Sequence, residues 1–269
     1  MRFPTLYIPH GGGPCFFMDW TMGPADTWDR MAAWLRSLSD ELPGRPQALL
    51  VMSAHWEEAV PTVMSGAQPP LLFDYYGFPP HTYELKWPAP GSPELATRVR
   101  SLLAGAGMQT GENAARGFDH GVFVPLLLAF PQAEVPTIQL SLRAGLDASE
   151  HLAIGRALAP LRDEGVLIIG SGMSYHNMRG FGTRQAAAPA RRFDDWLAET
   201  VELPDTKERA RRLTRWQEAP DALLCHPRSE HLTPLFVTAG AAADEPGRRI
   251  FGDQVMGVNV SGVRFGGQG

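Results

Sequence analysis

Four short runs of apolar and often β-branched residues recur along the chain, separated by longer stretches of helical character. The runs cover residues 5–9, 48–54, 137–142 and 166–170. Apolar runs of this length, without polar alternation, are typical of strands that are buried on both faces of a parallel sheet. Parallel strands need crossover connections, so the alternation of such runs with helices predicts an α/β fold.

Helices are expected at 25–42, 92–107, 149–165, 190–203 and 232–243, with a short break at 183–190. The second has Ser92 as N-cap and Pro93 at its first helical position. In the third, Ser149 serves as the cap, and Pro160 should kink or shorten the helix. Residues 248–265 alternate around Gly-Asp and read as an antiparallel hairpin or edge strands. The predicted fold is therefore a mostly parallel central sheet with helices on both faces and this hairpin at the C-terminus.

Length and composition limit the function classes. A chain of 269 residues is within reach of one α/β domain, and we expect a single domain over 1–269. A net charge of −5 argues against a nucleic-acid partner, and the longest apolar runs are too short to span a membrane. Two cysteines make no disulfide framework and, with no signal peptide visible, favour a cytoplasmic protein.

Three histidines follow predicted strands. His10 and His55 come directly after their strands, and His176 lies six residues beyond the strand at 166–170. The carboxyl ends of parallel strands share one edge of the sheet, which is where ligands bind in such folds. A single histidine there is more often a surface or core residue, but three with the same placement indicate a site.

Two further histidines lie in turn-like contexts. His120 stands in "FDHG", where bonding to its neighbours is the simpler explanation. His231 precedes or opens the last helix, which begins with either Ser229 or Thr233 as cap. The positive end of that helix dipole disfavours imidazolium and favours the neutral imidazole that binds metals; the simpler alternative is an exposed residue near the cap.

Several neutral imidazoles at a sheet edge suit a borderline metal such as Fe(II) or Zn(II). Their spacing is not that of a zinc finger or of H-E-x-x-H, so ligands would be gathered from distant segments, as in an open catalytic site. "GSGMS" at 170–174 is not a nucleophile elbow. The three glycines at 11–13 match no phosphate-binding fingerprint and are expected to keep the approach to a ligand clear.

Six segments carry a family resemblance. They are "HGGGP", "SAHWE", "FDYYGFPPHTYELKWPAPGSPELA", "GFDHGVFVPLLLAFPQAEVPTIQLSL", "HNMRGF" and "HPRSEHLTPLF". In this order, over residues 5 to 262, they resemble the 4,5-DOPA extradiol dioxygenase family, which belongs to the class III, LigB-type ring-cleaving dioxygenases.

The resemblance implies roles for the histidines. His10 and His55 match metal ligands, and His231 matches the position of a third ligand that is a glutamate in protocatechuate-cleaving relatives. Since Glu230 stands beside it, a carboxylate ligand is an alternative. His176 matches a residue treated as acid/base in LigB relatives and as a metal ligand in the DOPA-type branch, so it is assigned to both groups.

The same resemblance makes His120 a catalytic residue near substrate and oxygen. It implies an Fe(II)-dependent extradiol dioxygenase, in which Zn(II) can occupy the site as isolated. The partners are a small aromatic diol such as DOPA and O₂, the product is a muconic semialdehyde-type compound, and the protein is a monomer or homodimer.

Substrate contacts are expected from the aromatic segment 73–83. An aromatic wall could stack on a catechol ring, with Tyr75 and Tyr83 bonding its substituents; a rigid packed loop is the equal alternative. Arg179 could hold a substrate carboxylate, or form a surface ion pair. A zinc-dependent hydrolase and a non-catalytic metal-binding relative of the superfamily remain alternative functions.

Overall fold

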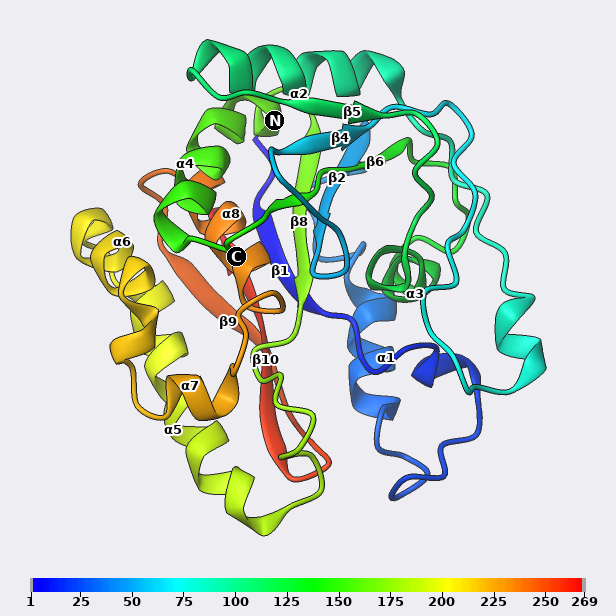
Figure 1. Ribbon diagram of the computed structural model, residues 1–269, viewed down its shortest axis with the longest axis vertical. Coiled ribbons are helices and arrows are strands. Elements are labelled where there is room, and N and C mark those ends of the chain that lie inside the picture. The colour runs from blue at the N-terminus through cyan, green and yellow to red at the C-terminus, as the bar shows by residue number, and fades with distance from the viewer. Residues whose placement is uncertain (1, 268–269) are drawn as a thin grey trace.

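A six-stranded sheet forms the centre of the computed structural model, which describes residues 2–267 (Figure 1). Its strand order is β6-β2-β8-β1-β10-β9, and two further pairs, β3 with β7 and β4 with β5, lie outside it. The strands are β1 Thr5–Pro9, β2 Ala48–Ser53, β3 Glu57–Glu58, β4 Thr62–Met64, β5 Gly111–Asn113, β6 Thr137–Gln139, β7 Leu142–Arg143, β8 Val166–Gly172, β9 Gly247–Val255 and β10 Val258–Phe265.

Four strands of the main sheet are parallel, as the apolar runs predict. β8 lies between β1 and β2, and β6 pairs with the far side of β2. In register, Ser171 of β8 faces Ile8 on one side and Ser53 on the other. The carboxyl ends of β1, β2 and β8 therefore meet at one edge, which places His10 and His55 side by side.

The C-terminal hairpin is confirmed, and its turn lies elsewhere than expected. β10 runs antiparallel to β1 and pairs with β9 through Val258 and Val255. The turn is Met256–Gly257, both with positive φ, whereas the Gly-Asp pair at 252–253 lies inside β9. Two residues with positive φ match the twist of a tight hairpin, which the Gly-Asp step within an extended strand does not need.

Helices cover both faces of the sheet. They are α1 Asp29–Ser37, α2 Pro93–Gly105, α3 His120–Ala129, α4 Ala148–Leu158, α5 Arg184–Glu202, α6 Thr206–Thr214, α7 Ala222–Cys225 and α8 Thr233–Ala241. On one face Thr5 bonds the Thr238 carbonyl of α8, and on the other Trp34 of α1 stacks on Phe251. In Figure 1, α1 and α3 lie on one side of the sheet and α4 to α8 on the other. Among residues 2–267, no helix is long and apolar enough to cross a membrane.

Four helix starts differ from the prediction, those of α1, α4, α5 and α8. α1 begins only at Asp29, because Thr27 and Asp29 are held in turns by bonds to Pro24 and Asp26. α4 is capped by Asp147, whose carboxylate accepts from Glu150 N at 2.9 Å, and Ser149 donates to that carboxylate instead.

The α-helix α4 ends at Leu158, and a 3-10 turn that contains Pro160 follows it, as expected. α5 begins at Arg184, inside the predicted break, and carries Pro189 within it. The N-cap of α8 is Leu232, neither of the two proposed residues, although the Ser229 carbonyl accepts bonds from Leu232 N and Thr233 N.

The sequence patterns gave no sign of α3, α6 or α7, nor of the short strands β3, β4 and β5. α3 was not predicted, because it is apolar and buried on all sides and so has no amphipathic period. The run at 137–142 is not one strand: after β6 the chain leaves the sheet and pairs β7 with β3. The switch is fixed by Ser141, which exchanges bonds with Thr62 through its backbone N and its hydroxyl.

Candidate metal centre

Three histidines from distant segments converge at the carboxyl edge of the sheet. The Nε2 atoms of His10 and His55 are 3.2 Å apart. The ring of His231 lies 5.2 Å from that of His10 and 4.9 Å from that of His55, and one ring nitrogen from each of the three fits within 4.8 Å of the others. The sequence placed His10 and His55 here through their strands, and the fold adds His231.

The orientation of His10 follows from a bond at the back of its ring. Its Nδ1 lies 3.1 Å from the hydroxyl of Ser171, and that hydroxyl donates its own proton to the Gly121 carbonyl. Ser171 can therefore only accept from His10, so Nδ1 carries the proton and Nε2 presents a lone pair.

The backbone of His231 is held against β8 by a close approach. Its carbonyl accepts from Met173 N at 3.1 Å and from the Tyr7 hydroxyl at 2.7 Å. A Cβ on Gly172 would lie 2.0 Å from this carbonyl oxygen, and one on Gly170 would lie 2.5 Å from the Pro234 carbonyl. These two glycines of "GSGMS" allow the start of α8 to reach the sheet edge.

His176 lies against His231 and shares a carboxylate with it. The two rings are stacked, with centroids 3.3 Å apart and planes at 15°. One oxygen of Glu230, Oε1, is 3.0 Å from Nδ1 of each ring. Glu230 therefore faces the backs of both histidines.

His120 approaches the cluster from α3, on the side of His55. Their ring centroids are 3.9 Å apart. Asp74 Oδ1 lies 2.8 Å from His120 Nδ1 and also accepts from His120 N at 2.9 Å. The approach depends on Gly121, where a Cβ would lie 2.4 Å from Ser53 Oγ. His120 thus lies beside the cluster and bonds Asp74, which is 46 residues away, rather than only its neighbours in the chain; within residues 2–267 no hydrogen bond forms at its Nε2.

A buried carboxylate ties these elements together. The side chain of Asp119 is fully buried and accepts from Ser53 Oγ at 2.6 Å, from Arg116 at 2.8 Å and from Gln139. These partners join the carboxyl ends of β2 and β6 to the start of α3. Buried charges are stable only when paired in this way.

Burial keeps the converging imidazoles neutral. It lowers the pKa of His10 and of His231 well below the usual value, and the neighbouring histidines add to the effect. Burial, with His120 next in size, lowers the pKa of His55 to about 4. Neutral imidazole is the form that binds metal, so the cluster is prepared to accept an ion at neutral pH.

The donor set fits a borderline divalent metal. For a tetrahedral ion with nitrogen ligands at about 2.1 Å, neighbouring ligand atoms lie about 3.4 Å apart. The 3.2 Å between His10 Nε2 and His55 Nε2 is close to this value. Histidine nitrogens without thiolates suit Fe(II), Zn(II) and similar ions. His10, His55 and His231 could therefore hold one metal ion.

The tyrosines of the aromatic segment bond their own loop. The Tyr75 hydroxyl donates to the Thr82 carbonyl at 2.5 Å, and burial raises its pKa to about 12. The Tyr83 hydroxyl lies 3.5 Å from the Tyr75 carbonyl and accepts from Phe78 N. The ring of Tyr75 is edge-on to His120 at 5.9 Å. The loop thus borders the site with a ring rather than with free hydroxyls.

Arg179 is exposed on the loop that carries His176. Its backbone N donates a hydrogen bond to Asn177 Oδ1 at 3.0 Å. Its proximity to a substrate carboxylate stays a prediction.

The glycines after His10 allow close packing of the chain. Gly11 and Gly13 have positive φ. A Cβ on Gly11 would lie 2.5 Å from Cys15 Sγ, and one on Gly13 would lie 2.9 Å from the Phe78 ring. Gly11 and Gly13 thus let the chain turn tightly against Cys15 and the Phe78 ring, and a clear approach for the substrate stays a prediction.

The other histidines have structural roles. His151 accepts from Arg143 N and bonds the Asp147 carbonyl, and buried His226 bonds the Ser174 carbonyl. His81 is exposed and bonds the Phe17 carbonyl, which links the aromatic loop to the turn after His10.

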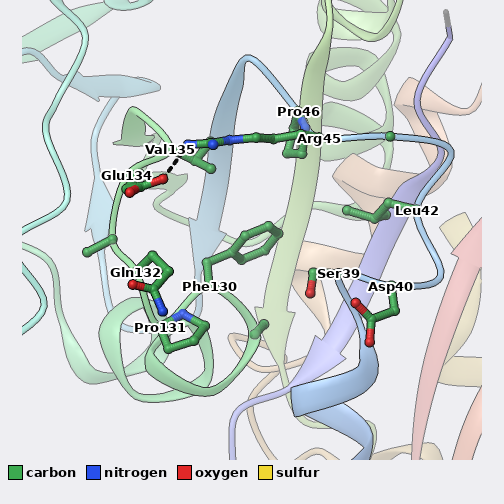
Figure 2. Close-up of a pocket in the computed structure, with 13 residues that line it drawn as sticks. Ser39, Asp40, Leu42, Arg45, Pro46, Phe130, Pro131, Gln132, Glu134 and Val135 are labelled. Carbon is green, nitrogen blue, oxygen red and sulfur yellow. Dashed lines mark hydrogen bonds and ion pairs between the residues drawn. The ribbon is translucent and has the colours of Figure 1, made fainter.

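A cavity of about 430 Å³ lies at the opposite edge of the sheet (Figure 2). It is lined by residues 39, 40, 42, 44–46 and 129–135, next to the first residues of β2 and β6, and the Arg45–Glu134 ion pair lies at it. It contains none of the five clustered histidines.

Sequence reasoning missed the carboxylates behind the histidines. Asp74, Asp119 and Glu230 each hold a site element, although Glu230 entered only as an alternative ligand. Asp119 and Glu230 are direct neighbours of site histidines in the chain, which is a usable signal. Asp74 is separated from His120 by 46 residues, and no local pattern joins them.

Comparison with known proteins agrees with this geometry. A family model described as the catalytic LigB subunit of aromatic ring-opening dioxygenase matches residues 4–261. The chain belongs to this family. The family resemblance stated from sequence motifs is thereby confirmed, and a LigB dioxygenase is expected to act on an aromatic compound with O₂ and a metal.

Relatives of this LigB chain cover most of its length. A Beta vulgaris protein named 4,5-DOPA dioxygenase extradiol is 44% identical over 89% of this chain and 87% of its own. Dioxygenase tasH of Hapsidospora irregularis is 36% identical, covering 98% and 86%. A 4,5-DOPA dioxygenase extradiol of Escherichia coli K12 is 32% identical, covering 98% and 92%.

A solved structure shares the fold. The crystal structure of an uncharacterized protein from Escherichia coli K12 superposes with a TM-score of 0.79 at 29% identity, over 98% of this chain and 100% of that chain.

Proposed function

We propose that this LigB-family protein is an extradiol ring-cleaving dioxygenase that acts on a catechol such as DOPA. The observation that carries the proposal is the convergence of His10, His55 and His231, with His120 and His176 beside them. Relatives named 4,5-DOPA dioxygenase extradiol, at 32–44% identity, support DOPA as the first substrate to test. The expected product is a muconic semialdehyde-type compound.

The metal would be held by His10, His55 and His231. Fe(II) is the ion expected for activity, and Zn(II) fits the same nitrogens. When bound, the metal lowers the cost of the catecholate and brings the aromatic ring and O₂ into electronic contact. The neutral state of the three imidazoles means that binding need not first displace protons from them.

His176 acts in this proposal as a base and not as a fourth ligand. A ligand imidazole directs its lone pair within the plane of its ring. Since His176 and His231 are stacked at 3.3 Å and nearly parallel, their Nε2 lone pairs run parallel and do not converge on one ion. With Nδ1 turned to Glu230, His176 Nε2 is the atom that would accept the proton of a catechol hydroxyl.

His120, on the other side of the cluster, is a further residue that could supply a proton. Asp74 holds its Nδ1, so Nε2 is the atom left to exchange a proton with substrate or oxygen. A carboxylate behind a histidine stabilises the protonated ring, which suits an acid that assists cleavage of the O–O bond. His176 is the first candidate for the acid step and His120 the second.

The substrate ring would lie against the aromatic loop. Tyr75 and Tyr83 remain the proposed wall, with the Tyr75 ring next to His120 as the supporting contact. Arg179 remains the proposed partner for a substrate carboxylate, because its exposed guanidinium lies on the loop that carries His176. A zinc hydrolase built on the same histidines would need no O₂, which separates the two functions experimentally.

The test is O₂ uptake by metal-loaded protein. Anaerobic Fe(II) loading is followed by O₂ with DOPA, protocatechuate, gallate or catechol, and the yellow semialdehyde is read by absorbance. We expect uptake and colour with at least one diol, and none with the Zn(II)-loaded control. His176→Ala is expected to keep the metal and lose turnover. Absence of O₂ uptake with every diol refutes the proposal, and metal loss in His176→Ala would make His176 a ligand.

A further inference from the structure

One carboxylate oxygen serves two histidines of the site. Glu230 Oε1 lies 3.0 Å from Nδ1 of His231 and 3.0 Å from Nδ1 of His176. A carboxylate only accepts, so in the neutral rings both Nδ1 atoms carry the proton. Both Nε2 atoms then present lone pairs, which is what a metal ligand and a base require.

The carboxylate is itself fixed. Its side chain is 14% exposed, and its other oxygen lies 3.5 Å from Arg228, which also pairs with Glu57 at 2.6 Å. Glu230 is thus an anchored anion behind the two rings.

We propose that Glu230 is the positioning residue of this site, which sets the tautomer of His231 and holds the His176 ring stacked over it. This inference rests on the proposed function only in taking His231 as a metal ligand and His176 as the base. It assigns Glu230 no bond to the metal and no proton transfer with substrate.

The geometry argues against Glu230 as a direct ligand. The ligand atoms of His10, His55 and His231 form one group within 4.8 Å. Glu230 belongs to another group, with His176 and His231. A glutamate that ligated the ion would have to release the Nδ1 atoms of both histidines and move in front of the rings.

The first test is the Zn(II) affinity of variants, measured by competition with a chelating dye. Glu230→Gln keeps an acceptor oxygen at Oε1 and should stay within about threefold of the wild type. Glu230→Ala removes it and should weaken Zn(II) binding about 10–100-fold, the usual loss for a partner behind a ligand. Glu57→Gln is the matched control, because it removes the same charge from the same arginine and touches neither histidine; its affinity should not change.

Two outcomes overturn the proposal. Equal loss in Glu230→Gln and Glu230→Ala would mean that the charge itself acts, as in direct ligation. Wild-type affinity in Glu230→Ala would mean that the carboxylate does not position His231.

A second measurement uses the wild-type protein, so a folding defect in the variants does not affect it. Long-range ¹H–¹⁵N spectra of metal-free ¹⁵N-labelled protein at pH 8 report histidine tautomers. We expect both His176 and His231 to carry the proton on Nδ1, and an Nε2–H tautomer at either position refutes the proposal. Neither the Zn(II) affinity nor the tautomer measurement needs turnover. A failure of the dioxygenase proposal can therefore be told apart from a failure of the proposed role of Glu230.

In the Fe(II)-loaded enzyme, a positioning role further predicts that Glu230→Ala lowers kcat more than it raises KM. Glu230→Gln should restore most of kcat, which a general loss of stability would not explain.

Discussion

Replacement of Gly172 by alanine tests whether the close packing of β8 against the start of α8 positions His231. The new Cβ would lie 2.0 Å from the His231 carbonyl oxygen. Carbon and oxygen atoms that are not bonded rarely approach closer than about 3.3 Å, so one backbone must move by about 1 Å. β8 is paired on both sides, with β1 and β2, so the start of α8 is the part that yields.

The shift would also strain the two bonds that this carbonyl accepts, from Met173 N and the Tyr7 hydroxyl. Overpacking of this kind costs about 1–3 kcal/mol of the free energy of unfolding. A ligand moved by about 1 Å should lose at least as much as one that loses its hydrogen-bond partner, about 10–100-fold in metal affinity. Turnover should fall about 100-fold, as for other misplacements of this size.

The assay compares Zn(II) affinity and urea unfolding for Gly172→Ala and for Gly105→Ala. Within residues 2–267, and apart from its chain neighbours and the nearby backbone of α2, nothing lies within 4 Å of a Cβ built on Gly105, which makes it the matched control. In this control we expect unchanged metal affinity and a stability change of about 1 kcal/mol or less. Wild-type affinity in Gly172→Ala would refute the reasoning, because it would show that the close approach of α8 to β8 does not set the position of His231.

Three further predictions concern single side chains. His10→Ala should reduce bound Zn(II) from one equivalent to near zero, whereas exposed His81→Ala should keep it; unchanged metal in His10→Ala would make the ligand assignment wrong. Asp74→Asn keeps an acceptor for His120 but removes the charge behind it. The kcat with a catechol should therefore fall about 10–100-fold while the metal content stays constant. An unchanged kcat would refute a role for the Asp74 charge. Burial lowers the pKa of His226 to about 4, whereas the same side chain in the unfolded chain has a pKa of about 6.5. Between these two values the unfolded chain binds a proton that the native state does not bind. The free energy of unfolding therefore falls as the pH falls from 6.5 to 4. His226→Gln should therefore lose about 3 kcal/mol less over that window than the wild type in urea titrations of metal-free protein, and parallel curves for the two would contradict the assignment.

The strands and the positions of His10 and His55 could be predicted because their signals are local. Each apolar run ends where its strand ends, and His10 and His55 follow at once. Parallel strands share an edge, so their proximity needed only the strand assignment. The start of α2 at Ser92 and Pro93 was equally local, since the cap and the first turn lie within three residues.

The buried helix and the carboxylates could not be predicted in this way. α3 has apolar side chains on all sides, so no helical period marks it, and the role of His120 came only through family resemblance. Asp74 meets His120 across 46 residues, and Tyr7 reaches the His231 carbonyl across 224. Such pairs depend on how loops and helices pack, and no window of neighbouring residues contains both partners.

The sequence by itself determined the class of fold, the strand ends that carry histidines and the neutral, nitrogen-rich character of the site. Tertiary structure alone decided which histidine faces which. It set His231 against β8 through Gly172, stacked His176 on it, and placed Glu230 and Asp74 behind the rings. The physical reason is range: propensity and periodicity act over a few residues, whereas ligand geometry at a scale of about 1 Å is fixed by contacts between segments that only the packed chain brings together.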